Sequence, residues 1–216
     1  MVKNNGGSKP YYTQRNNKVS PDAACNVTAM VAALSAAGYD VDSLVPAGVQ
    51  PEDDLMRFIR RYPEVLECWK KLDPTGKTPP NEWHALLELG TNRWLDAKGV
   101  RRNSEIVTWS TGVSLAALKK CLDDGGAAVM SGLFYDAEAR LKINHVIAII
   151  GYKTEDGEHV DGFFIDDSWG DYTTGYRNKR GKSVYMPFED WKNICKPIGC
   201  WGKWGHLIRR FDGYRS

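Results

Sequence analysis

The residue in this sequence best placed to act as a nucleophile is Cys25, in the stretch DAACNVTAM (22–30). A free thiol has a pKa of about 8.5, whereas the first turn of a helix and a neighbouring imidazolium favour the thiolate. Thiol catalysis also needs an imidazole that accepts the proton and a group that orients this imidazole. A lone cysteine is more often a small buried residue, so the chemistry depends on partners elsewhere in the chain.

Among the four histidines, His145 is the one expected to be a partner. His84 lies in a predicted helix and His159 in a charged loop, both ordinary surface positions, and His206 begins the last predicted strand. His145 opens the stretch HVIAIIGY, which is apolar on both faces and therefore typical of a central strand. A titratable ring has no packing reason to lie there, although a hydrogen-bonded core histidine is the alternative interpretation.

The next predicted strand, FFIDDSWG, brings a carboxylate to the same end of the hairpin. A turn centred on Asp156-Gly157 places His145 opposite Ser168, with Asp167 one position away, and a single-residue bulge in the loop would bring His145 and Asp167 level. Side chains alternate along a strand, so Asp166 faces away from Asp167 and only one of them can serve. We therefore expect Asp167 to accept the second N–H of the imidazole and to fix its tautomer.

Helices in the first half of the chain and strands in the second half must position these residues. Cys25 falls in the first turn of a helix whose residues Val27, Met30, Val31 and Leu34 form one apolar stripe. Helices before strands predict an α+β fold in which the N-terminal helices pack on a C-terminal antiparallel sheet. Residues 1–10 are expected to be a flexible tail and residues 11–216 a single domain, because no linker or repeat interrupts them. Helices are predicted over 22–37, 52–62, 81–97, 114–123 and 187–194, and strands over 127–134, 143–150, 162–167, 184–186 and 206–211.

With these motifs in this order, the sequence resembles the papain-like cysteine peptidases, whose orienting residue lies in an NSWG motif. DSWG (167–170) places Asp167 at the Asn position. An aspartate in this role is similar to the bacteriocin-processing branch, the double-glycine leader peptidases, although Ser168 departs from the Asp-Pro motif found there. That branch also has a glutamine upstream of the cysteine in a YxxQ context, and YYTQ gives Gln14. Asn26 stands where most relatives have glycine.

The resemblance covers about 11–38 and 114–194, and it implies a papain-like fold and mechanism. It makes Cys25, His145 and Asp167 a catalytic triad and Gln14 an oxyanion donor. Gln14 lies 11 residues before Cys25, farther than in papain, so the loop between them must fold back. The region 39–113 matches no pattern that we can name.

The function predicted from these residues is hydrolysis of amide bonds in a peptide or protein. Bacterial cell-wall peptides, as for a phage-type lysin, are one candidate substrate. The basic stretch GYRNKRGK (175–182) and three tryptophans, Trp191, Trp201 and Trp204, would suit an anionic wall, although a solvated hairpin and core packing explain them equally well. Two alternatives use the same residues: a thiol acyltransferase of the transglutaminase type, and a non-catalytic peptide-binding descendant.

Charge and hydropathy exclude other classes of function and location. A net charge of +2 gives no reason to expect nucleic-acid binding. The longest apolar run, VIAIIGY, is too short to span a bilayer, and the N-terminus lacks the apolar stretch of a secretory signal. We therefore expect a cytoplasmic protein, or one released without a cleavable signal, and a monomer.

The five cysteines suggest reduced thiols, since their number is odd and no secretory signal precedes them. Cys195 and Cys200 flank a Lys-Pro-Ile-Gly turn and could form a disulfide under oxidation. A zinc site that combines them with His206 lacks a fourth ligand at the required spacing. Neither a metal ion nor a cofactor is expected.

Overall fold

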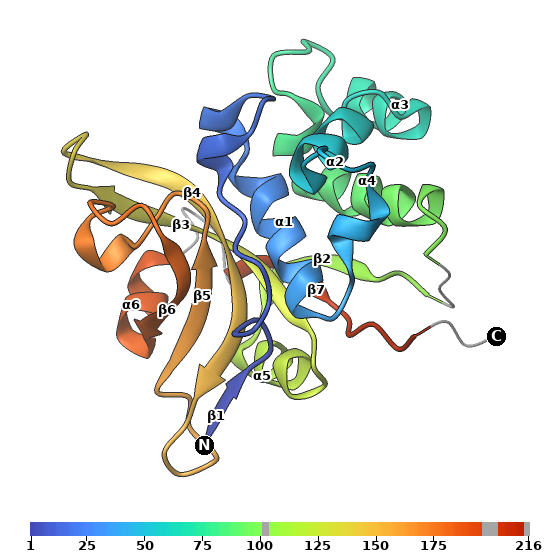
Figure 1. The fold of residues 1–216 in the computed structure, drawn as a ribbon. Helices are drawn as coiled ribbons and strands as arrows, with labels where there is room; N and C mark the ends of the chain where they lie inside the picture. Colours follow the sequence, from blue (N-terminus) through green and yellow to red (C-terminus); the bar gives the residue numbers. More distant parts are fainter. Residues whose placement is uncertain (101–103, 196–202, 214–216) are drawn as a thin grey trace.

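Three layers are visible in Figure 1, a computed structural model that describes residues 1–100, 104–195 and 203–213. The long helix α1 lies between a group of helices and one antiparallel sheet. The helices are α1 Cys25–Ala36, α2 Pro51–Ile59, α3 Pro63–Leu72, α4 His84–Ala97, α5 Leu115–Asp123 and α6 Phe188–Ile194. The strands are β1 Val2–Asn4, β2 Val107–Val113, β3 Ala127–Asp136, β4 Leu141–Lys153, β5 Gly162–Asp167, β6 Gly181–Pro187 and β7 Lys203–Ile208.

Helix α1 is buried along its whole length. Every residue from Asn26 to Ala36 is buried, so the apolar stripe expected from the sequence is only part of a helix that is covered on all sides. Strands β3 and β4 pack against it from the sheet, and α2 packs against it from the other layer. The helix begins three residues later than expected, because Pro21–Ala23 form a 3-10 turn instead. Cys25 is consequently the first residue of α1.

The sheet has the strand order β2-β7-β3-β4-β5-β6, and all of its pairings are antiparallel. The α+β prediction, with α1 packed on an antiparallel sheet, is confirmed. The last strand in the sequence, β7, lies between β2 and β3 rather than at an edge. Helix α5 packs against β3, β4 and β7, and α6 packs against β3, β5 and β6.

The first strand was not predicted. The sequence suggested a flexible tail over residues 1–10, but Val2–Asn4 pair with the end of β4, at Gly151–Lys153. This part of β4 lies beyond the start of β3, so its backbone groups are open to another strand. A β-carbon at Gly151 would lie 2.1 Å from the carbonyl oxygen of Lys3, so glycine is what lets β1 approach. Strand β2 was also missed.

The helices between α1 and β2 cover the outer side of α1. One helix was expected over 52–62, but there are two, since Pro63 is the first residue of α3 rather than only a stop. Helices α2 and α4 approach closely at Gly90, where a β-carbon would lie 2.5 Å from Ile59. This layer carries residues into the site described next.

Candidate active site

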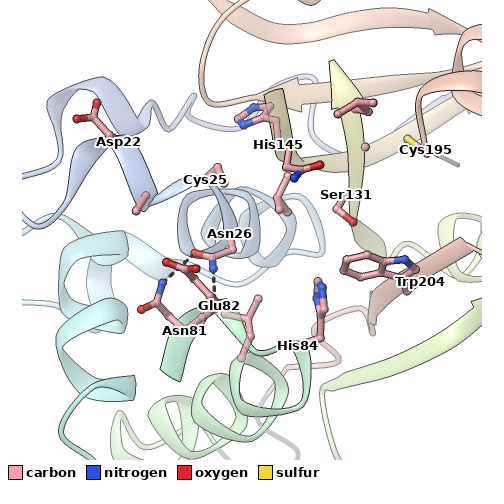
Figure 2. Close-up of a pocket in the computed structure, with 16 residues that line it drawn as sticks. Asp22, Cys25, Asn26, Asn81, Glu82, His84, Ser131, His145, Cys195 and Trp204 are labelled. Atoms are coloured by element: carbon pink, nitrogen blue, oxygen red, sulfur yellow. Dashed lines mark hydrogen bonds between the residues drawn. The ribbon is translucent and has the colours of Figure 1, made fainter. Parts of the chain in front are cut away.

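Cys25 opens onto a cavity of about 450 Å³. The residue is half-buried, and the helix N-terminus directs unpaired backbone N–H groups toward the same end of α1. Figure 2 shows Cys25 and Asn26 facing His145, Ser131 and Trp204 across the cavity, with His84 on its lower side. The described residues of its walls come from the 3-10 turn and the start of α1, the segment around Asn81–Leu87, strands β3, β4 and β7, and Cys195 after α6.

His145 and Asp167 lie in direct contact, with 2.7 Å between Nε2 of His145 and Oδ1 of Asp167. The ring is 3% exposed and the carboxylate 0%, so the pair is removed from water. The sequence prediction that these two residues meet is thus matched by their positions. Because Nε2 faces the carboxylate, Nδ1 is the ring nitrogen left for Cys25.

The register that brings the pair together differs from the predicted one. Tyr152 pairs with Phe163, but Ala148 pairs with Asp166, since the register shifts between Ile149 and Gly151. The turn is centred one residue later than predicted, and a bulge within β4 then shifts the pairing by one residue. Asp167 is diagonal to His145 on one face of the sheet rather than level with it. Asp166 faces the other way, as alternation predicts, and accepts a hydrogen bond from the Ser183 N–H at 2.7 Å.

The environment of His145 favours its charged form. Burial alone would lower the pKa of the imidazole, but the charge and hydrogen bond of Asp167 outweigh it, and the Cys25 side chain, which lies within hydrogen-bond reach, adds to them. Together they raise the pKa of His145 to about 10. The site thus favours a proton on His145, between the Asp167 carboxylate and the Cys25 sulfur.

The Asp167 carboxylate accepts hydrogen bonds from three donors. Besides His145, the backbone N–H of Trp169 donates to Oδ1 at 3.0 Å, and the Tyr176 hydroxyl donates to Oδ2 at 3.1 Å. Burial is the main reason that the pKa of Tyr176 is raised, so this hydroxyl remains a donor. The sequence did not reveal Tyr176, because it belongs to the basic stretch 175–182 that we interpreted as a solvated hairpin. Residues 177–180 are indeed exposed, whereas Tyr176 is fully buried.

Gln14 lies beside this pair but not on the cavity wall. Its Oε1 accepts a hydrogen bond from the Ser168 hydroxyl at 2.7 Å, and its Nε2 donates to the Pro21 carbonyl at 2.8 Å. The loop between Gln14 and Cys25 folds back through two 3-10 turns, as the long interval required. One of the two amide hydrogens of Gln14 is therefore used within the loop, and the other remains.

A carboxylate from α2 holds this loop in place. Asp53 is buried, and its two oxygens accept the backbone N–H groups of Lys18 and Val19 at 2.9 and 3.0 Å. Hydrogen bonds from backbone N–H groups to a buried carboxylate are among the stronger ones in proteins. The unassigned region 39–113 thus supports the segment that carries Gln14 toward Cys25.

Two asparagines join the start of α1 to the same region. Asn26 Nδ2 donates to the Asn81 carbonyl at 2.6 Å, and Asn81 Nδ2 faces Asn26 Oδ1 at 3.4 Å. Both residues are buried, and the Oδ1 of Asn81 also accepts from the guanidinium of Arg60 at 2.8 Å. Asn26 therefore fixes the segment that begins with Asn81 next to Cys25.

His84 was assigned to an ordinary surface position, which is wrong. It lines the cavity. Its ring meets Trp204 edge-on, with 4.1 Å between the ring centroids, and stacks with Trp109, with 6.0 Å between the ring centroids. Burial, and then the neighbouring His206, lower the pKa of His84 to about 3, so its ring is neutral at physiological pH. His206 is buried and faces the His84 carbonyl through Nε2 at 3.0 Å. The periodicity of α4 gave no sign that its first residue faces a cavity.

The remaining cysteines and tryptophans have other surroundings. Cys121 donates weakly to two backbone carbonyls, and burial raises its pKa to about 11. Cys195 is buried on the cavity wall, whereas Cys200 and Trp201 lie outside the described residues. Trp191 is not an exposed wall-binding residue, since it is 3% exposed and packs against Phe163 and Phe188.

Two further properties follow from the described part of the chain. No group of three or more His, Cys, Asp or Glu side chains in residues 1–100, 104–195 and 203–213 could hold a metal ion. Within the same ranges, every helix is too short or too polar to cross a lipid bilayer.

Comparisons with known proteins agree with this architecture. No curated protein sequence matches the chain. A crystal structure of a proposed C39-like peptidase from Bacillus anthracis superimposes with a TM-score of 0.57 at 16% sequence identity, and the alignment covers 98% of each chain. At this identity the likeness establishes the fold alone. The sequence profile of the Peptidase_C39 like family matches residues 8–196. Since the match spans most of the sequence, the chain belongs to the Peptidase_C39 like family, relatives of the bacteriocin-processing papain-like peptidases.

Proposed function

We propose that this protein is a cysteine peptidase that hydrolyses amide bonds through Cys25, His145 and Asp167. The observation that carries the proposal is the buried 2.7 Å contact between His145 and Asp167, next to a cysteine that begins a helix and opens onto a cavity. Nucleophile, base and orienting group are thus in the order that thiol catalysis needs. Family membership supports the same reaction class.

The proposed reaction begins with transfer of the Cys25 proton to Nδ1 of His145, since Nε2 is held by Asp167. The thiolate attacks the carbonyl carbon of the substrate amide, and the carbonyl oxygen becomes an oxyanion. The backbone N–H of Cys25 and the second amide hydrogen of Gln14 stabilise this oxyanion. His145 then gives its Nδ1 proton to the leaving amine as the C–N bond breaks, which leaves a thioester on Cys25.

Water completes the proposed cycle. His145 accepts a proton from a water molecule that attacks the thioester, and the same proton returns to the sulfur as the carboxylic acid product leaves. Asp167 keeps the ring oriented throughout. Loss of one oxyanion donor, as in Gln14→Ala, should lower kcat by about 10² to 10³.

The decisive experiment tests Cys25. Cys25→Ala should abolish hydrolysis of casein and leave the melting temperature nearly unchanged, because alanine suits a first helical turn. In the unmodified protein, iodoacetamide at pH 6 should label Cys25 much faster than Cys68 or Cys121. Full casein hydrolysis by Cys25→Ala would contradict the assignment, and slow labelling of Cys25 would favour a peptide-binding descendant.

Two further measurements define the reaction and its substrate. Release of the acyl group to water, rather than to an added amine, separates a peptidase from an acyltransferase. Zymography on purified murein beside a casein gel tests bacterial cell-wall peptides as the substrate. The wall hypothesis draws less support from the tryptophans than the sequence suggested, because Trp191 is buried and Trp204 lines the cavity.

A further inference from the structure

Tyr176 has a backbone conformation that is unusual for a residue with a large side chain. Its φ is 66°, in the left-handed region that glycine adopts readily and that aromatic residues rarely enter. It follows Gly175, which ends the 3-10 turn Tyr172–Thr174. Residues held in such conformations persist where the surrounding structure fixes them, and they are often found at functional sites. The contacts of Tyr176 should therefore account for its conformation.

The Tyr176 side chain is fully buried, although residues 177–180 directly after it are exposed. Its backbone N–H donates to the Asp171 carbonyl at 3.0 Å, which closes the turn. Its ring meets the His145 ring nearly edge-on, with 6.1 Å between the ring centroids. Its hydroxyl lies 3.1 Å from Oδ2 of Asp167. The left-handed turn thus allows one residue of an exposed loop to reach the buried His145–Asp167 pair.

The donors to Asp167 are divided between its two carboxylate oxygens. Nε2 of His145 and the backbone N–H of Trp169 contact Oδ1, whereas the Tyr176 hydroxyl donates to Oδ2. A carboxylate that accepts at both oxygens cannot rotate without losing a hydrogen bond. Tyr176 therefore fixes the orientation of the group that in turn orients the imidazole.

The same hydroxyl weakens the attraction of Asp167 for the imidazolium proton. A hydrogen bond donated to a carboxylate stabilises its charged form, so that the carboxylate attracts other protons less. Burial, and then the charge and hydrogen bond of Asp167, raise the pKa of Tyr176, so its hydroxyl stays protonated and remains a donor. Burial lowers the pKa of His145, but Asp167 outweighs burial and raises it to about 10. Without the Tyr176 hydroxyl, the pKa of His145 should rise further.

Other ionisable groups also face this pair or Tyr176. They are Cys25 at the start of α1, Asp136 at the end of β3, Tyr11 in the N-terminal segment and Asp166 on the opposite face of β5. The Tyr11 hydroxyl donates to the backbone carbonyl of Asp167 at 2.7 Å and not to its carboxylate. Burial raises the pKa of Asp166 to about 6, so its charge does not change above pH 8. The titration of the imidazolium in alkaline solution therefore reports the balance between Asp167 and its donors.

We propose that Tyr176 is a positioning residue of this site, whose hydroxyl holds the Asp167 carboxylate in place and sets the upper limit of the pH range in which His145 keeps its proton. This inference rests on the proposed peptidase function, since it concerns the regulation of the same triad by pH. Tyr176 is not among the described residues that line the cavity, so it acts through Asp167 and not on the substrate. An imidazolium that releases its proton more readily is also the better acid for the leaving amine.

Tyr176→Phe tests the proposal, because it keeps the ring and removes only the hydroxyl. The rate at which iodoacetate alkylates Cys25, followed by peptide mass spectrometry, reports the thiolate–imidazolium pair without a substrate, since the imidazolium attracts this anionic reagent. The alkaline limb of this rate, near pH 10 in the unmodified protein, should move up by about half a pH unit to one unit. The acid limb, where Cys25 loses its proton, should not move. On casein, kcat should fall by about tenfold while KM is unchanged.

Tyr172→Phe is the matched control. Its hydroxyl donates to Oδ2 of Asp190 at 3.0 Å, and its ring lies against Phe134, as the ring of Tyr176 does. It should leave the alkaline limb and kcat unchanged. A second variant, Tyr176→fluorotyrosine with fluorine beside the hydroxyl, nearly keeps the size of the ring and makes the hydroxyl a stronger donor. Here the alkaline limb should move to lower pH, which tests the proposal even if Tyr176→Phe does not fold.

The outcomes separate this inference from the function on which it rests. If casein hydrolysis depends on Cys25 but the alkaline limb stays in place in the Tyr176 variants, the inference is overturned and the peptidase function stands. A fall in kcat that accompanies a lower melting temperature, with an unmoved limb, assigns Tyr176 to packing alone. An equal shift in Tyr172→Phe also overturns the inference. If the limb moves as expected but no substrate is hydrolysed, the proposed function fails and the role of Tyr176 at the His145–Asp167 pair is kept.

Discussion

Replacing Asp167 is the most informative test of the site, because its carboxylate accepts three hydrogen bonds. Asp167→Ala leaves His145, the Trp169 N–H and the Tyr176 hydroxyl without their acceptor. Breaking a buried ion pair by removing one partner costs about 3–5 kcal/mol. For a chain of this size, each kcal/mol corresponds to about 2–4 °C in melting temperature, so we expect a fall of roughly 10 °C. The imidazole also loses its orienting group, and kcat/KM should fall by at least about 10².

Asp167→Asn should be much milder. An asparagine oxygen can accept the N–H groups of His145 and Trp169, and its amide can donate to the Tyr176 oxygen. The charge of Asp167 is lost, however, so the pKa of His145 should fall from about 10. The alkaline limb of the pH profile of kcat/KM, where the imidazolium loses its proton, should therefore move to lower pH in this variant.

The pH dependence of protein stability provides an independent check that the pKa of His145 is raised in the folded state. The folded pKa of His145 is raised above the unfolded value of about 6.5, so its contribution is fully present below pH 6.5 and is lost as the pH rises toward 10. Asp167→Asn should flatten this decline in urea unfolding between pH 7 and 9.5. Asp166→Ala is the matched control, because Asp166 is equally buried but lies on the other face of β5. If Asp166→Ala loses activity at full stability while Asp167→Ala keeps it, the triad is wrong.

Three other perturbations have defined outcomes. Burial raises the pKa of Glu52 to about 7, helped by the charges of Asp53 and Asp42 and opposed by a backbone hydrogen bond, so its protonated form is favoured in the folded state. The free energy of unfolding should then fall as the pH rises from about 4.5 to 7. At pH 8, Glu52→Gln should be more stable than the unmodified protein by about 2 kcal/mol in urea unfolding. An unchanged urea midpoint would contradict this expectation. Asp53→Ala removes the acceptor of the two backbone N–H groups in the loop after Gln14. It should lower kcat/KM and reduce the free energy of unfolding by about 2 kcal/mol. If other contacts hold the loop, kcat/KM and stability will not change. Cys121, with a raised pKa, should react with a disulfide reagent at pH 8 far more slowly than Cys25, and equal rates would show that the thiol is not shielded.

The parts of the site that the sequence revealed are those governed by local periodicity. Alternation along β4 and β5 placed His145 and Asp167 at one end of a hairpin, and the helix pattern placed Cys25 in the first turn of α1. The predicted register was wrong because the turn is centred one residue later than Asp156-Gly157, and because a bulge inside β4, at Ile150, leaves no mark in a continuous apolar run. The contact between His145 and Asp167 could thus be predicted from the sequence. The catalytic roles of these residues and of Cys25 remain predictions.

Other parts of the site depend on pairings between distant segments. Asp53 supports the loop after Gln14, and Asn81 holds Asn26, but neither has a local pattern that names its partner. Tyr176 reaches Asp167 from a stretch whose charges suggested only a solvated turn. Likewise β1 and β2 are short or partly exposed strands whose positions are set by the open backbone of β4 and by β7. Such contacts follow from the fold as a whole.

The place of β7 has a consequence for how the fold forms during synthesis. Strand β7 joins β2 to β3 although about 70 residues of sequence separate it from the end of β3, so this part of the sheet forms only after residues 203–208 have left the ribosome. Pairings of such long sequence separation are formed slowly. A chain that ends before residue 203 would keep the direct pairing of β4 with β5, which carry His145 and Asp167, but it would leave β2 and β3 without the strand between them. Such a truncated chain should be prone to aggregate through the exposed edges of β2 and β3, which sedimentation would reveal.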